Sequence, residues 1–412
     1  MGDSSDRAGF DPTAVIAGGR VARSTAVRRR QRAAFAVSGG VCLAWSAGVT
    51  VAGLWGRVTD HGVAAATMVI GSFVAGATPQ GGGAVAFPVF TKGLEISSAT
   101  ARTFSLCIQS VGMTTAAVSI VLRRSAVEWR AVAVGVVAGV VGFALALSTL
   151  ADWDEPFAPL RIPGPYVKVT FSLIVLAMTA ATIVGLRSPI RSVTDQLPRA
   201  GTRTWMLLTG FGLAGGAAAA VLGSGADVMI YLFLVVILGV RSTVGVPTSV
   251  VTMALLSIVG AVVFAGFDRQ FATTFAADGT VVAVGGDLLA TPAAPRQADV
   301  FGMWLAAVPI VAWGAPMGAL VASRLRSTDL ARVVVALGVT EVLTTVLFVP
   351  ELRSDAALGG FGLAGAVVGV AGVVGLSNRL HHGRDAGGSL TITRDSVEVS
   401  TDYLEEIHGR DR

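Results

Sequence analysis

The chain has 412 residues, of which 53% are hydrophobic and 14% charged, and its mean hydropathy is +0.71. A soluble protein of this balance has too little polar surface to cover itself, so the composition excludes an ordinary water-soluble domain and indicates a polytopic membrane protein. The net charge of +5 does not indicate a nucleic-acid partner, because the arginines fall in short loops and tails, as orientation signals do. Cys42 and Cys107 lie in separate apolar runs, which predicts neither a disulfide nor a metal site. No cofactor is expected.

The N-terminal tail, residues 1–32, is polar and carries an arginine cluster that ends at Arg32. An apolar run over residues 33–55 follows, which is longer than the core of a signal peptide and shows no clear cleavage site. We therefore expect a retained first transmembrane helix, with the N-terminus held in the cytoplasm by the arginines.

Charge alternates along the loops between the later apolar runs. Arginine-rich loops around Arg123, Arg191 and Arg324 alternate with acidic connections around Asp154, Asp287 and Glu351. Arginine-rich loops remain in the cytoplasm, so this alternation places both termini and the polar tail 377–412 there. The expected spans after the first are residues 97–121, 130–150, 168–186, 243–266, 300–322, 330–349 and 359–376.

Two further apolar stretches are interrupted by glycines. Residues 62–94 contain the break Thr78-Pro79-Gln80-Gly81-Gly82-Gly83, and residues 204–239 contain Gly223-Ser224-Gly225-Ala226-Asp227. The loop charges require each stretch either to re-enter on one side or to cross twice. Each break is followed by three spans, and the two sets start from opposite sides of the membrane. The predicted fold is an all-α integral membrane protein with about eight full spans and two interrupted segments, in an inverted repeat of residues 60–186 and 204–349.

Two polar segments lie outside the predicted bundle. Residues 267–299 form a long outside loop, in which Val281 to Ala290 is expected to form a small hairpin turning at Gly285 and Gly286. A short strand is expected near Leu390 to Ile392 in the C-terminal tail. Neither segment is assigned a function.

Broken helices in matching halves are the usual place for a transporter's substrate site. Glycine-rich turns and helix N-termini bind anions through backbone N–H groups, and a guanidinium matches an oxyanion through paired hydrogen bonds. Each feature has an ordinary structural alternative: glycines allow close helix packing, Arg102 extends to the membrane interface, Gln109 joins two helices, and hydroxyls bond their own backbone. The candidate substrate-binding residues are Gln80, Gly81, Gly82, Gly83, Arg102, Ser105, Gln109, Gly223, Ser224, Gly225, Thr248 and Ser249.

Two acidic residues, Asp227 and Glu341, lie in apolar surroundings. An unpaired carboxylate at membrane depth costs roughly 2.5 to 3.5 kcal/mol even on the mild insertion scale, so each must be protonated, paired or in a cavity. Both are candidate proton carriers. The alternatives are that Asp227 caps the second half-helix and that Glu341 pairs with an arginine or a hydroxyl on a neighbouring helix.

The chain resembles the TauE/SafE sulfite-exporter family of bacterial membrane transporters. The motifs that carry the resemblance are GGGAVAFPVF (81–90), ARTFSLCIQSVGMT (101–114), GSGADV (223–228), VPTSVVTMALLSIVG (246–260) and WGAPMGALVASRL (313–325), within about residues 60–350. The resemblance implies a protein of the bacterial plasma membrane that moves small sulfur oxyanions or organosulfonates, usually outward. Its departures are the shorter second glycine run, Ile230 in place of the first half's Pro88, the extra first helix, the long outside loop and the C-terminal tail.

An alternating-access secondary transporter is therefore the leading hypothesis, with coupling to protons left open. Enzyme activity is not expected, because the four histidines lie outside the spans, and an ATP-driven pump is disfavoured because the chain contains no GxxxxGK[ST] loop. An anion channel, or a transporter of another small anion, remains the alternative. The expected partners are a small anion and the lipid bilayer, and the oligomeric state stays open.

Overall fold

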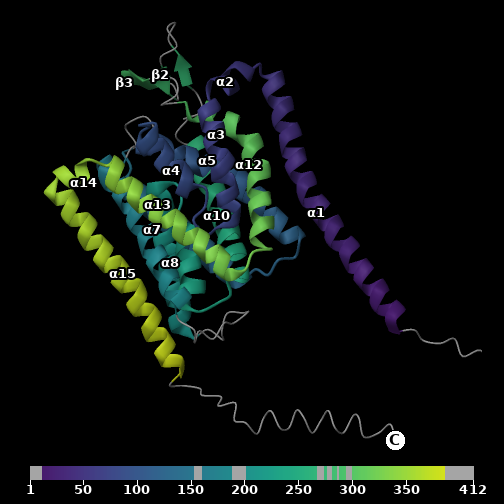
Figure 1. The fold of residues 1–412 in the computed structure, drawn as a ribbon. Coiled ribbons are helices and arrows are strands. Elements are labelled where there is room, and N and C mark those ends of the chain that lie inside the picture. The colour runs from purple at the N-terminus through teal and green to yellow at the C-terminus, as the bar shows by residue number, and fades with distance from the viewer. Residues whose placement is uncertain are drawn as a thin grey trace, which may run out of the picture.

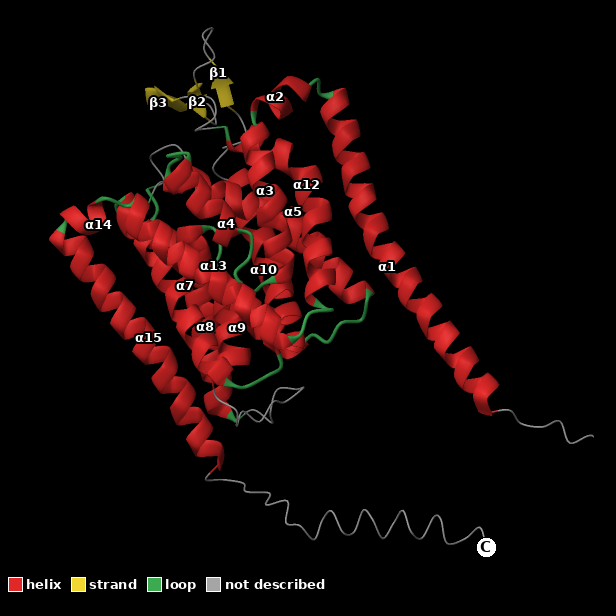
Figure 2. Cartoon of the chain, viewed as in Figure 1, coloured by secondary structure: helices red, strands yellow, loops and turns green. Residues whose placement is uncertain are grey.

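The computed structural model describes residues 12–152, 160–187, 201–266, 273–275, 281–284, 287–293 and 299–385. It is a bundle of long helices with a small sheet at one end, which is called the sheet end below (Figures 1 and 2). Within the described residues, eight helices are long and apolar enough to cross a membrane, which confirms the all-α membrane class.

Each half of the bundle begins with a helix that breaks, restarts and passes into a π-helical turn before three long helices follow. The first half comprises α3 (Gly62–Ala77), α4 (Gly83–Pro88), η1 (Val89–Gly93), α5 (Ser98–Leu122), α6 (Trp129–Leu150) and α7 (Gly164–Arg187). The second half comprises α8 (Thr202–Leu222), α9 (Ala226–Tyr231), η2 (Leu232–Ile237), α10 (Ser242–Gly266), α12 (Val300–Ala322) and α13 (Ser327–Phe348).

The backbone repeats with a separation of 144 residues around the two breaks. Gly81 and Gly225 both have positive φ angles, of 64° and 127°. Glu95 and Gly239 also have positive φ angles, of 56° and 70°. The helices α5 and α10 both contain 25 residues and begin at Ser98 and Ser242. The matching order of elements therefore extends to single residues. Since only the first half has Pro88 before its π-helical turn, that proline is not what causes the turn.

The two halves exchange their broken helices. Helix α3 of the first half packs along α12 of the second, and α8 of the second packs along α6 of the first. Glycines permit both contacts, because a methyl group at Gly76 would overlap the carbonyl of Ala315 and one at Gly216 would overlap the carbonyl of Gly139. Small residues at such crossings let helix backbones approach closely inside a membrane.

Two of the predicted spans and one of the interrupted segments differ from the observed helices. Helix α1 (Pro12–Val51) begins within the predicted tail, and its apolar part is Arg28–Val51. Helix α8 is long enough to cross a membrane before its break, although it was expected only as part of an interrupted segment. The predicted last span lies in α15 (Ala356–Asp385), whose described apolar part, Ala356–Gly372, is shorter than 18 residues. The two short connecting helices are α2 (Trp55–Asp60) and α14 (Glu351–Ser354).

Helix α1 crosses the outside of the bundle and contacts α12 (Figure 1). Pro309 has no N–H, so the carbonyl of Leu305, four residues earlier, lacks its usual helical donor. The indole N–H of Trp45 donates to that carbonyl across 3.0 Å, and Phe35 stacks on Trp313. The extra helix therefore satisfies a backbone group that a proline leaves open.

In chain order, a three-stranded antiparallel sheet follows α10 and precedes α12. Its strands are β1 (Thr273–Phe275), β2 (Val281–Val284) and β3 (Asp287–Ala293). The pairing of Val284 with Asp287 confirms the predicted hairpin, while β1 was not expected. Gly285 and Gly286, and the strand predicted near residue 391, lie outside the described residues.

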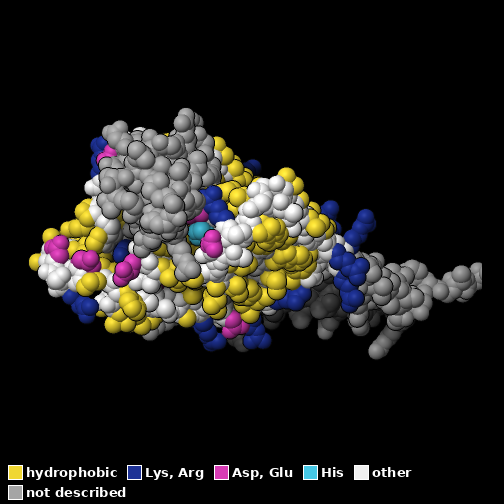
Figure 3. Space-filling model, turned by 90° about the horizontal axis from the view of Figure 1, so that it is seen from above, with side chains coloured by type: hydrophobic (Ala, Val, Ile, Leu, Met, Phe, Trp, Pro, Cys, Tyr) yellow, Lys and Arg dark blue, Asp and Glu magenta, His cyan; other side chains and the backbone are white. Residues whose placement is uncertain are grey.

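The outer surface of the bundle is apolar. Viewed from the sheet end, hydrophobic side chains cover much of its flank (Figure 3). Leu43 on α1, Val137 on α6 and Leu363 on α15 are each at least two-thirds exposed. Such a surface is unsuited to water and suits a lipid environment.

Candidate functional site

The two helix breaks meet inside the bundle. A methyl group at Gly81 would overlap Oδ2 of Asp227, and one at Gly83 would overlap the hydroxyl of Ser224. Only glycine allows this approach, so both breaks depend on residues without a side chain. The structure thus brings together the two predicted halves of the site.

Helix α5 passes beside the meeting point. The amide of Gln109 donates to the carbonyl of Gly223 across 2.8 Å, and the hydroxyl of Ser105 donates to the same carbonyl across 3.1 Å. Gly223 has a φ of 77°, and a Cβ there would lie 2.5 Å from the carbonyl oxygen of Arg102. The candidate residues Ser105 and Gln109 of α5 therefore contact the break of the other half.

Arg102 is fully buried, so it does not extend to the membrane interface. Its guanidinium carbon lies 4.7 Å from the centre of the Phe264 ring on α10. A guanidinium over an aromatic face is a favourable cation–π arrangement. The side chain places a positive charge within the protein, one helical turn before Ser105.

Four buried oxygen atoms near the breaks have no hydrogen-bond partner among the described residues. Oδ2 of Asp227 and Oε1 of Gln109 both face Gly81, whose Cβ position would be 3.3 Å from the Gln109 oxygen. Gln80 and Ser224 occupy equivalent positions in the two halves, each directly before a glycine of positive φ. Buried polar atoms are nearly always bonded in proteins, so such a concentration is a feature of binding sites. The four atoms are Gln80 Oε1, Gln109 Oε1, Ser224 Oγ and Asp227 Oδ2.

Asp227 lies in the first turn of α9 and bonds backbone N–H groups at the helix start. This agrees with the expectation that it caps the second half-helix. Its Oδ1 accepts hydrogen bonds from the N–H groups of Gly225 and Val228, at 3.3 and 3.0 Å. This cap leaves Oδ2 directed at the first break. Gln80 is held from the opposite side, since its amide donates to the carbonyl of Val334 on α13 across 3.2 Å.

Two predicted hydroxyl residues make their contacts away from the breaks. Thr248 donates to the carbonyl of Val244 and accepts from the N–H of Glu128, and Ser249 donates to the carbonyl of Val246. These bonds match the alternative that hydroxyls in membrane helices bond their own backbone. A role for Thr248 and Ser249 in binding stays a prediction.

Glu341 belongs to a separate buried cluster between η1, α7 and α13. Its Oε1 accepts from the ammonium of Lys92 across 2.5 Å and from the hydroxyl of Ser172 across 2.6 Å. Thr345 contacts both Lys92 and Ser172. The hydroxyl partner was expected, but the cation was not, because the sequence points to no pairing for Lys92. The one unusual feature of Lys92 in the sequence is its residue type, since Lys92 and Lys168 are the only lysines among 31 basic residues.

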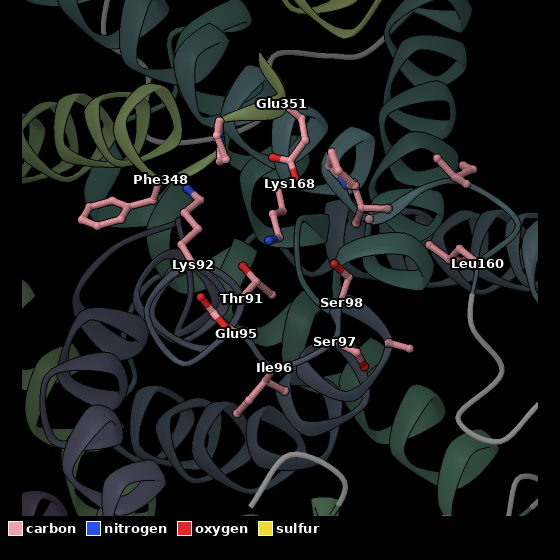
Figure 4. A pocket seen from close by; sticks show the side chains of 16 residues that line it. Thr91, Lys92, Glu95, Ile96, Ser97, Ser98, Leu160, Lys168, Phe348 and Glu351 are labelled. Carbon is pink, nitrogen blue, oxygen red and sulfur yellow. The ribbon is translucent and has the colours of Figure 1, made fainter. Parts of the chain in front are cut away.

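Two cavities lie at opposite ends of α5. The lysine cavity, of about 600 Å³, is lined at the start of α5 by Ser97 and Ser98 and by both lysines of the chain (Figure 4). The arginine cavity, of about 330 Å³, is lined by Ile120 and Arg123 at the end of α5. Burial, and secondarily the charge of Arg324, lower the pKa of the Arg123 guanidinium.

Neither cavity is lined by residues of the two breaks. Gln80, Ser224 and Asp227 are each no more than 1% exposed. The arginine cavity reaches Gly76, just before the first break, and the lysine cavity reaches Thr91 and Lys92 in η1, beyond the short helix α4 that follows the break. The breaks are therefore closed off from both ends of the bundle in this conformation.

Comparison with protein families gives one match. The sequence model described as "Sulfite exporter TauE/SafE" matches residues 63–286, which include both breaks and every described element from α4 to β2. The motif at residues 313–325 lies beyond the matched range. No curated protein and no solved structure matches the chain.

Proposed function

Because the chain belongs to the sulfite exporter TauE/SafE family, we propose that it is a secondary transporter that exports a small sulfur oxyanion or organosulfonate, of which sulfite is the simplest. The observation that carries this proposal is the contact between the two broken helices, where Gly81 meets Asp227 and Gly83 meets Ser224. Broken helices in matching halves are where transporters of several folds bind substrate.

The proposed mechanism is alternating access around the breaks. The substrate site is closed to both cavities here, as expected for an occluded state between the two open ones. Since α3 packs on α12 and α8 on α6, each half carries the broken helix of the other. A rocking motion of one half against the other would open the breaks first to the arginine cavity and then to the lysine cavity.

The anion would be bound by hydrogen-bond donors from both breaks. The glycine turns contribute backbone N–H groups and Ser224 contributes a hydroxyl. The amides of Gln80 and Gln109 would donate to the anion by exchanging their present bonds to Val334 and Gly223. Arg102 provides a buried positive charge nearby. This set suits a small oxyanion, because each of its oxygen atoms can accept from a different donor.

We extend the proposal to proton coupling through Asp227. An ionised carboxylate is costly to bury unless it is well paired, and Oδ2 of Asp227 has no partner among the described residues. A bound proton offsets that cost and allows Oδ2 to donate to Gln109 or to the substrate. Glu341 is the weaker candidate, because its Oε1 already pairs with the ammonium of Lys92.

The loop charges support an orientation in the bacterial plasma membrane with both termini in the cytoplasm. In that orientation the arginine cavity faces the cytoplasm and the lysine cavity faces outward. Labelling of single cysteines placed at Ser125 and at Glu351 with a membrane-impermeant maleimide tests this directly. Only the Glu351→Cys variant should react in intact cells, and the reverse pattern would overturn the orientation.

Counterflow in proteoliposomes tests the function. Liposomes loaded with unlabelled sulfite should accumulate labelled sulfite transiently, with a rate that saturates, and chloride should not compete. Gln80→Ala should lower this rate at least tenfold, while Gly93→Ala, at a position with open space around it, should leave it unchanged. Unsaturable flux with a steady conductance would indicate a channel instead, and absence of exchange for sulfite, thiosulfate and sulfoacetate alike would overturn the sulfur-oxyanion proposal.

The coupling is tested by the same assay at different internal and external pH. Asp227→Asn keeps the shape and the cap acceptor of the side chain but cannot ionise. We expect it to retain exchange and to lose acceleration by a proton gradient. A gradient response equal to that of the wild type would exclude Asp227 as the carrier.

A further inference from the structure

We propose that the lysine cavity is a second anion-binding site, separate from the breaks, which takes a small tetrahedral oxyanion or sulfonate against the ammonium of Lys168. The proposal deepens the proposed function, because it gives the transported anion a station on its way out. It rests on a cavity and its charges rather than on the break geometry, so the two can fail independently.

The cavity gathers the lysines of the chain in one place. Lys92 comes from the end of η1 and Lys168 from the first turns of α7, and both line the same space. All 29 other basic residues are arginines, found mostly in loops and tails. The second half has no equivalent of Lys92, because the residue 144 positions later is Val236. The lysines therefore distinguish this end of the bundle from the other.

The two lysines are in different states. The ammonium of Lys92 is directed toward Glu341 and Thr345 and is buried with them. Lys168 is half-buried, its side chain extends into the middle of the cavity (Figure 4), and no ion pair or side-chain hydrogen bond of it is found among the described residues. Lys168 is thus the cation available to a ligand, while the Lys92–Glu341 pair forms a neutral wall.

Further hydrogen-bond donors lie on the wall of the cavity formed by the start of α5. Helix α5 begins at the cavity wall, where Ser97 caps Thr100 and leaves the N–H groups of Ser98 and Ala99 at the open helix end. The side chains of Ser98 and Lys168 line the same cavity (Figure 4). The N-terminus of α5, a helix of 25 residues, carries a partial positive charge, which adds to that of the lysine.

The acidic residues of the cavity stand at its rim. Glu95 and Glu351 are exposed, and their charges are screened by solvent, whereas the lysines lie deeper. An anion that passes outward meets the lysine first and the carboxylates afterwards. The arrangement leaves the positive charge of Lys168 dominant in the deeper part of the cavity.

Lysine acetylation measures binding here directly, because the chain has only two lysines. The purified full chain in detergent is treated with the N-hydroxysuccinimide ester of acetic acid, and acetylation of each lysine is followed by mass spectrometry. Sulfate and methanesulfonate serve as probes, because neither consumes the reagent, and chloride at equal ionic strength is the control. Lys92, buried and paired, is the internal reference.

We expect Lys168 to react faster than Lys92, and sulfate to slow its acetylation at least fivefold in a saturable manner. Chloride should change the rate less than twofold. Protection should persist in Gln80→Ala, because the breaks are a different site, and should weaken in Ser98→Ala. Equal rates in sulfate and chloride would overturn the proposal, as would a Lys168 that reacts no faster than Lys92, or protection that disappears in Gln80→Ala.

Transport supplies the second readout. Lys168→Met should raise the half-saturating anion concentration on the lysine-cavity side several-fold, and Lys168→Arg should restore it. Protection of Lys168 without transport of any sulfur anion would remove the proposed function and leave this site in place. Transport without protection, and with Lys168→Met unchanged, would remove this site and leave the function.

Discussion

The ammonium of Lys92 donates to Oε1 of Glu341 across 2.5 Å and so ties the end of the first broken helix to α13. Both side chains are at most 3% exposed, and 249 residues separate them in the chain. A charge pair so deeply buried is stable only while both partners are present, because either one alone would be an unpaired charge in an apolar interior.

Removing one partner of this pair should therefore cost more than removing both. We expect Lys92→Met to lower the free energy of unfolding by about 3–5 kcal/mol, and Glu341→Gln by less, since the amide still accepts from Ser172. The double variant Lys92→Met/Glu341→Leu should recover most of the loss. Urea unfolding in detergent checks the three variants, and a double variant as unstable as Lys92→Met would contradict the prediction.

The contact between Gly83 and Ser224 predicts a rescue experiment. Gly83→Ala places a methyl group onto the Ser224 hydroxyl and should separate the two breaks, which lowers the counterflow rate at least tenfold. Ser224→Gly removes the obstacle together with one proposed anion donor. The double variant should therefore have a higher maximal counterflow rate than Gly83→Ala alone, while its half-saturating anion concentration stays raised. Gly93→Ala is the matched control, since open space surrounds that position. A double variant no better than Gly83→Ala would show that the contact is not what limits transport.

Glu95 has a φ of 56°, in the left-handed region that favours glycine, and its repeat equivalent is Gly239. That conformation costs a residue with a side chain about 1–2 kcal/mol. Glu95→Gly should therefore raise the free energy of unfolding, and with it the unfolding temperature. The net gain should be about 1 kcal/mol once the cost of glycine's greater flexibility in the unfolded chain is subtracted. Gly239→Ala should lower the unfolding temperature. A lower unfolding temperature for Glu95→Gly, or a higher one for Gly239→Ala, would refute the left-handed assignment at these two positions.

The bond from Trp45 to the Leu305 carbonyl predicts a dependence on Pro309. Trp45→Phe should cost about 1 kcal/mol of stability, since it leaves the carbonyl without a donor. In a Pro309→Ala background, the new N–H of residue 309 can bond that carbonyl, so the same Trp45 change should cost less. A double-mutant cycle measures the difference, and a coupling of zero would show that the indole N–H is not needed there.

The helix breaks could be predicted from the sequence because glycines interrupted long apolar runs at Gly81 and Gly223. The loop arginines supported two matching halves, and the 144-residue separation in the structure is consistent with them. Helix α8 was underestimated, because its break comes only after Leu222, so a helix long enough to cross a membrane precedes it. Strand β1 was missed because three residues are too few to show an alternating pattern.

The contacts between halves were beyond a single sequence. Gln109 bonds the carbonyl of Gly223 across 114 residues, and nothing local to either residue indicates the other. Glu341 was recognised as a buried acid in need of a partner, yet the choice of Lys92 depends on how η1 packs against α13. The sharing of one cavity by Lys92 and Lys168 likewise follows from tertiary packing, although their rarity was visible in the composition.

The exchange of broken helices between the halves also bears on how the protein is made. Helix α8 meets its partner α6 as soon as it leaves the ribosome, because α6 has already been synthesised. Helix α3 must wait for α12, which begins more than two hundred residues after α3 ends. At roughly 5–20 residues per second, its glycine-lined face stays uncovered for about ten to forty seconds. Newly inserted chains therefore spend that interval with the first break of the proposed site in place and its packing partner α12 still missing, which exposes α3 to misassembly.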